Sequence, residues 1–249
     1  MFEVLRQYTP NGAPDRSTLG WLLLPALVAF CLLAFDRFGI EHKFAQMFGA
    51  SLAAAGHDDN QIRFFAQLWL SGSCVVLMVV LPTLFLWTFP EDHAWGLRGG
   101  QLKAHLPIYA LLMLIMLPVL WWVAGGGEFQ TFYPMYDPRS LQMWLLFEAA
   151  YLTQFFCVEY FFRGPILFRL HARFGYAAIG MLVVPYALIH IYKPFPEAIG
   201  SIIAGLLLGF LALKARSIWL GVLLHCGVAF TMDTFALLRS GRFAQLLGG

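Results

Sequence analysis

The chain contains 249 residues, of which 60% are hydrophobic, 16% aromatic and 12% charged. The charged fraction of an ordinary soluble domain is about twice as large, and the mean hydropathy here is +0.70. Fourteen acidic and 16 basic residues are too few to cover the surface of a soluble globule of this length. The composition therefore excludes a soluble domain and indicates an integral membrane protein.

The formal net charge of +2 comes without any run of lysine or arginine, so no nucleic-acid partner is expected. The N-terminal segment is polar and lacks the cleavage pattern of a removable signal peptide, so the first span is expected to stay in the mature protein. The cysteines fit neither a zinc ribbon nor a redox pair and are interpreted as small buried hydrophobic residues. They are Cys31, Cys74, Cys157 and Cys226.

A helix needs about 20 mostly apolar residues to cross about 30 Å of hydrocarbon. Seven stretches of the chain meet this requirement. They are residues 18–35, 63–89, 106–125, 141–163, 176–192, 198–213 and 218–238. The pattern predicts an all-α polytopic membrane protein with seven or eight transmembrane helices, of which the C-terminal four form a core.

The whole chain, residues 1–249, is interpreted as a single integral membrane domain. Residues 1–105 hold the N-terminal spans, with a helix over 39–61 that is too polar to cross and is expected to lie in the interface. Residues 106–238 hold the core. A cytoplasmic N-terminus is favoured by three arginines clustered after the fourth span, namely Arg163, Arg169 and Arg173.

A stripe of small residues follows one face of the sixth predicted span. Gly205 and Gly209 lie one turn apart, with Ser201 one turn before them. Small residues at this spacing let a second helix backbone approach closely. The stripe predicts helix packing.

Ionisable side chains inside a span are costly and mark candidate functional sites. The candidates inside the predicted spans are Glu148, Glu159, Arg163, His190, His225 and Asp233. Glu159 and Arg163 are four residues apart and share a helix face, so the guanidinium can hold the carboxylate. His190 and His225 come from two later spans and are the two histidines expected at membrane depth.

One carboxylate and two imidazoles are the parts of a water-activating site. Amide hydrolysis needs a base for the water and a donor for the oxyanion, and glutamate and histidine can fill these roles near neutral pH. The structural alternative is a buried ion pair beside hydrogen-bonded packing histidines. Glu148 precedes Glu159 by about 16 Å along the helix, too far to share one water. It is expected to make a polar contact between helices.

Two other hydrolytic chemistries are less well supported. Zinc is disfavoured because the chain has no HExxH motif and no two histidines four residues apart on one helix. A serine protease is disfavoured because the candidate serines lack a GxSxG setting. These serines are Ser71, Ser73 and Ser217.

Three motifs in order give the core a family resemblance. They are VEYFFRG at 158–164, YALIH at 186–190, and the glycine-spaced run 200–209 that leads through LALKARSIWLGVLLHCG to His225. The segment GLRGGQLK at 96–103 resembles the stretch that precedes the core. Together, residues 96–233 resemble the CAAX protease and bacteriocin-processing family of intramembrane glutamic endopeptidases, whose pattern is EExxxR, FxxxH and HxxxN.

The resemblance implies a metal-free endopeptidase without cofactors. In it, Glu159 and His190 would activate water, His225 would donate to the oxyanion, and Arg163 would fix the carboxylate helix. Tyr186 and the loop 190–197 are expected around an entry for substrate. There, Lys193 and Glu197 would contact the substrate, or would pair with each other or with lipid headgroups. Two positions depart from the pattern, because Val158 replaces the first glutamate and Ala229 the asparagine. Asp233, one turn beyond Ala229, is a candidate to supply the missing donor in its protonated form.

The expected function is cleavage of a protein substrate close to the bilayer. The substrate could be a prenylated C-terminus, a leader peptide or a C-terminal membrane anchor, and the single glutamate with HIYKPFPE favours the anchor branch of bacterial sorting-type members. The expected location is the bacterial inner membrane. The alternatives are a non-catalytic scaffold or immunity protein of the same family, or a proton-coupled transporter that uses Glu159.

Overall fold

The computed structural model describes residues 16–91 and 94–246, so the polar N-terminal segment lies mostly outside the described residues. Every regular element in the described part is a helix. The elements are α2 (Arg16–Ala34), η1 (Phe35–Gly39), α3 (Glu41–Ala54), α4 (Asp59–Cys74), η2 (Val75–Val80), α5 (Leu81–Thr88), α6 (Leu102–Val123), α7 (Gly127–Phe132), α8 (Leu141–Arg163), α9 (Pro165–Phe174), α10 (Ala177–Leu188), α11 (Phe195–Ala215), α12 (Trp219–Arg239) and α13 (Phe243–Leu246). The predicted all-α class is confirmed.

Six helical stretches in the described residues are long and apolar enough to cross a membrane. They are Arg16–Ala54, Asp59–Thr88, Leu102–Val123, Leu141–Phe174, Phe195–Ala215 and Trp219–Arg239. The prediction of a span over 176–192 was wrong, because α10 has only 12 residues, or about 18 Å of helix. The predicted interfacial helix corresponds to α3, which continues the first stretch; its position in the interface stays a prediction.

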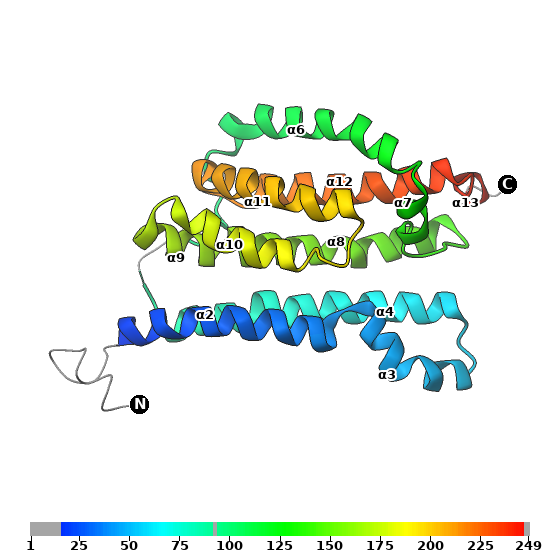
Figure 1. Ribbon diagram of the computed structural model, residues 1–249, viewed down its shortest axis with the longest axis horizontal. Coiled ribbons are helices and arrows are strands. Elements are labelled where there is room, and N and C mark those ends of the chain that lie inside the picture. Colours follow the sequence, from blue (N-terminus) through cyan, green and yellow to red (C-terminus); the bar gives the residue numbers. More distant parts are fainter. Residues whose placement is uncertain (1–15, 92–93, 247–249) are drawn as a thin grey trace.

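The helices lie in layers, as Figure 1 shows. α6 packs on α12, α12 on α8, and α8 on α4, with α2 beside η2 and α10 beside α11. The last two turns of α8 are buried on every face, since each residue from Cys157 to Arg163 is buried. A helix covered all round lies in the centre of the protein. The two ionisable residues at this end of α8 are therefore in the middle of the bundle.

The ends of the helices meet at two opposite ends of the bundle. At the Arg16 end, the start of α2 lies next to the end of α5, because Ser17 donates to Glu91 over 3.0 Å. α12 starts at the same end, where Ile218 N donates to the Gly96 carbonyl. At the Arg239 end, Arg242 pairs with Asp137 at 3.2 Å, which joins the end of α12 to the loop before α8.

Two helix starts at the Arg239 end are fixed by side-chain caps. Asp58 accepts from Gln61 N, and Gln61 returns a bond to Asp58 N, which forms a capping box at the start of α4. That backbone bond, together with Arg139, lowers the pKa of the Asp58 carboxyl. Ser140 accepts from Met143 N at the start of α8. Both caps satisfy amide groups that have no partner within their helix.

α10 and α11 form an antiparallel hairpin. Gly209 lies against Ile179, and Gly205 lies against Val183 and Tyr186. The small-residue stripe therefore packs α11 on α10, as the sequence predicts. The hairpin starts and finishes at the Arg16 end, and its tip is covered by α7, where Phe195 N donates to Glu128 over 3.1 Å.

Candidate functional site

Glu159 lies at the centre of the site, held by two basic side chains from two helices. Its Oε1 accepts from Arg163 Nη1 at 3.0 Å and from His225 Nδ1 at 3.1 Å. Arg163 is one turn further along α8, whereas His225 reaches across from α12. Glu159 and Arg163 are 1% and 2% exposed. The structure thus brings together three of the residues that the sequence singled out.

Gly221 on α12 gives the carboxylate its space. A Cβ at this position would lie 2.6 Å from Glu159 Oε2, closer than real Cβ atoms approach an oxygen. Gly221 precedes His225 by one turn, so both residues face Glu159 from the same side of α12. The sequence analysis did not identify this glycine, although its spacing of four from His225 is a usable signal.

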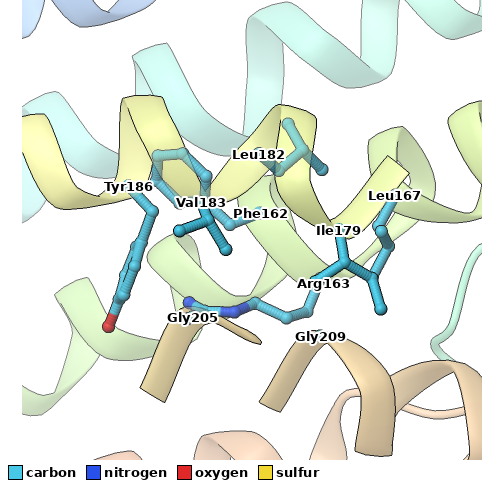
Figure 2. Close-up of a pocket in the computed structure, with 9 residues that line it drawn as sticks. All are labelled: Phe162, Arg163, Leu167, Ile179, Leu182, Val183, Tyr186, Gly205 and Gly209. Atoms are coloured by element: carbon cyan, nitrogen blue, oxygen red, sulfur yellow. The ribbon is translucent and has the colours of Figure 1, made fainter. Parts of the chain in front are cut away.

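The guanidinium of Arg163 is held by a second contact, from Tyr186 on α10. Its central carbon lies 3.8 Å from the centre of the Tyr186 ring, which is a stacked cation–π arrangement. Figure 2 shows the Arg163 side chain extended toward Gly205, with the Tyr186 ring beside it. The small residues of α11 leave room for both groups. Tyr186 thereby connects the hairpin to the ion pair.

His190 follows α10 at the tip of the hairpin. Its Nδ1 donates to the Tyr186 carbonyl oxygen over 2.9 Å, and its ring lies 4.6 Å from the ring of Tyr186. No direct contact joins His190 to Glu159 in the described residues. The two groups are instead linked through Tyr186 and Arg163.

An apolar cavity of about 410 Å³ adjoins the site between α6, α8, α11 and α12. His190 and His225 line it, and Phe155 packs against the His225 ring at 4.6 Å between centroids. Most of the other lining side chains are aliphatic. They include Ile115, Val119, Ile203 and Leu207, which are 36–66% exposed on the outer surface of the protein.

A charged cluster lies one turn beyond His190 at the same cavity. Glu197 lines the cavity, accepts from the Tyr133 hydroxyl at 2.9 Å and lies 3.8 Å from Lys193. Lys193 also donates to the Tyr133 hydroxyl over 3.0 Å. Burial raises the pKa of Tyr133 well above its ordinary value, so the hydroxyl keeps its proton for Glu197. The sequence analysis identified Lys193 and Glu197 but not Tyr133.

Asp233 lies apart from the catalytic candidates. It is fully buried two turns beyond His225, does not line the cavity, and faces Glu148 of α8 closely enough for the two carboxyl groups to interact. None of the four carboxyl oxygens has a hydrogen-bond partner of standard geometry in the described residues. The expected role of Asp233 as a substitute oxyanion donor stays a prediction.

The two positions that depart from the family pattern have different surroundings. Val158 packs in a hydrophobic cluster with Cys157 and Phe161, away from the cavity. Ala229 lines the cavity one turn beyond His225. Tyr109 of α6, another residue that the sequence analysis missed, is 4% exposed among leucines of α11 and α12, and its hydroxyl has no partner in the described residues.

One comparison with known proteins gives a match, to a segment within the C-terminal half of the chain. Residues 140–231 match the family model of the type II CAAX prenyl endopeptidase Rce1-like proteins. No curated protein and no solved structure matches the chain. The matched range contains Glu159, Arg163, His190 and His225. In the described residues, no group of three or more histidine, cysteine, aspartate or glutamate side chains is arranged to hold a metal.

Proposed function

We propose, on the premise that residues 140–231 belong to the type II CAAX prenyl endopeptidase Rce1-like family, that the protein is a membrane-embedded endopeptidase. Its reaction is hydrolysis of a peptide bond with water activated by Glu159, His190 and His225. The observation that carries the proposal is the 3.1 Å contact between Glu159 and His225, made inside the family domain at the wall of a large cavity.

The apolar cavity supports a substrate with an apolar segment. Its aliphatic lining would bury such a segment, while the two imidazoles supply polar groups for one peptide bond. Because lining residues of α6 and α11 are also exposed on the outer surface, a segment in the hydrocarbon could reach the cavity sideways. We favour removal of a C-terminal membrane anchor. A prenylated C-terminus or a leader peptide is the alternative substrate.

Lys193 and Glu197 are proposed substrate contacts. They lie beside the cavity, three and seven residues after His190, and they neutralise each other across the Tyr133 hydroxyl. A polar residue that flanks the apolar segment of the substrate would exchange with one of these bonds. The proposed location is the bacterial inner membrane.

The proposal is tested by mass spectrometry of protein termini. Membrane and secreted proteins of the host would be compared between the native protein and Glu159→Gln, expressed at equal levels. We expect a defined set of new termini that disappears in Glu159→Gln and persists in the control Asp59→Asn, which changes an exposed carboxylate in the first turn of α4 at the Arg239 end. The reaction should continue in a chelator, because the chemistry requires no metal.

The other outcome favours the non-catalytic alternatives. If the native protein and Glu159→Gln give the same termini, the Val158 and Ala229 departures mark a scaffold or immunity protein, or a transporter with Glu159 as its proton site. A proton-flux assay in proteoliposomes then separates the transporter from the scaffold.

A further inference from the structure

We infer that Glu159 acts through His225: the carboxylate holds Nδ1 of the imidazole, and Nε2 of His225 takes the proton from the attacking water. This inference rests on the proposed function. It assigns different roles to Glu159 and His225 from those that the family resemblance implies. There, the glutamate is the base and His225 the oxyanion donor. Here His225 is the catalytic residue, and Glu159 and Gly221 are positioning residues.

The position of Glu159 argues against direct contact with water in the cavity. The side chain is 1% exposed and does not line the cavity, whereas His225 does. Its Oε1 already accepts two hydrogen bonds, and its Oε2 faces the backbone of α12 at Gly221. His225 therefore stands between the carboxylate and the cavity.

The hydrogen bonds also fix where the imidazole protons are. A backbone carbonyl can only accept, so Nδ1 of His190 carries the proton that bonds to Tyr186. The carboxylate of Glu159 likewise accepts, so Nδ1 of His225 carries a proton. When each ring is neutral, its Nε2 is bare and acts as a hydrogen-bond acceptor and a base. In that state His225 cannot be the oxyanion donor.

In the proposed reaction a single water uses both Nε2 atoms, because His190 and His225 line the same cavity. The water oxygen forms a bond to the carbonyl carbon of the substrate while one of its protons moves to Nε2 of His225. The second proton of the water bonds to Nε2 of His190. When the carbon–nitrogen bond breaks, His225 returns its proton to the leaving nitrogen, which gives an acid and an amine. Glu159 stabilises the imidazolium in between, as a carboxylate does in a Ser-His-Asp triad.

This arrangement accounts for a single glutamate at the site. Val158, which stands where the family resemblance places the first glutamate, is packed in the core and has no access to the cavity. A histidine base needs only one carboxylate behind it. Arg163 balances the charge of that carboxylate at 3.0 Å while the imidazole is neutral.

The first test needs no substrate. Purified protein in detergent is treated with a water-soluble carbodiimide and glycine ethyl ester, and the labelled carboxylates are identified by mass spectrometry. Glu197, which lines the cavity, should be labelled, and Glu159 should be labelled only after unfolding. Labelling of Glu159 in the folded protein at a rate like that of Glu197 would overturn the inference.

The second test uses a matched pair of glycines on α12. Gly221→Ala places a methyl group against Glu159 Oε2, whereas a Cβ at Gly227 meets only the Met113 side chain at 3.6 Å, an ordinary contact. We expect Gly221→Ala to lower kcat at least 100-fold with little change in KM, and Gly227→Ala to stay within twofold of native. Equal kcat in the two variants contradicts the positioning role. The measurement uses the peptide that the native protein cleaves fastest.

The third test asks which group is the base by chemical rescue. Imidazole added to His225→Ala should restore cleavage at least tenfold, because the missing ring leaves a space open to the cavity. Formate added to Glu159→Ala should restore nothing, because that space is closed behind His225. The reverse pattern assigns Glu159 as the base. If the native protein cleaves no peptide, the proposed function fails, while the carbodiimide test still decides whether Glu159 lies behind His225.

Discussion

Arg163 combines an ion pair and a ring contact in one buried side chain. It donates to Glu159 at 3.0 Å and stacks 3.8 Å from the Tyr186 ring centre. Arg163→Met would leave a buried carboxylate without a countercharge, which costs about 3–5 kcal/mol of folding free energy. The measurement is unfolding by denaturant in detergent, with Arg98→Met in an exposed loop as the control. A loss as small as that of the control would mean that Glu159 is neutral in the folded protein.

For these residues, the spacing of the motifs predicted which side chains come together but not which atoms are in contact. Four residues separate Glu159 from Arg163, so their contact follows from the helix period. The contact of Glu159 with His225 depends on the rotation of α12 about its axis, which packing decides. Tyr109 and Tyr133 were missed for the same reason, since each comes from an element far away in sequence.

Within the elements, the α10–α11 hairpin depends on small residues where the two helices touch. A Cβ on Gly209 would lie 2.9 Å from a methyl group of Ile179. Gly209→Leu should therefore destabilise the protein by about 1–3 kcal/mol through overpacking. Thermal unfolding in detergent measures the effect.

The control for that substitution is on the partner helix. Gly180 is exposed on α10 and has no neighbouring atoms within 4 Å of a Cβ position, so Gly180→Leu should leave the unfolding midpoint close to native. Equal losses in Gly209→Leu and Gly180→Leu would show that leucine harms these helices by itself, and that the close packing is not the cause.

The sequence pattern predicted the wrong length for α10. Residues 176–192 are apolar enough for a full span, but hydropathy does not record where a chain turns back. Pro185 has no amide hydrogen, and the helix ends three residues later at Leu188. The turn that follows carries His190 into the bundle. The turn after Leu188 therefore shortens the span and also places His190 at the cavity.

The depth of the site in the whole molecule follows from the place where α8 meets α12. Glu159 faces Gly221, the third residue of α12, so it lies within about one turn of the start of that helix at the Arg16 end. The cavity runs from there along α12 to Met232 and to Glu197 near α7. Glu159 and His225 thus lie toward one face of the membrane, whereas His190 and the charged cluster lie at the tip of the α10–α11 hairpin.

The arrangement of the helices also predicts that the two ends of the bundle lie on opposite sides of the membrane. α10 and α11 return to the end where they start, so they do not change the side on which α12 begins.

Cysteines introduced as Arg98→Cys and Ser240→Cys would occupy exposed positions at the Arg16 and Arg239 ends. With a cytoplasmic N-terminus, a membrane-impermeant maleimide added to intact cells should label Ser240→Cys alone. Both variants should react after permeabilisation. Labelling of both in intact cells contradicts the arrangement, because each membrane face would then expose the same end of the bundle. Labelling of Arg98→Cys alone keeps the arrangement and places the site nearer the outer face.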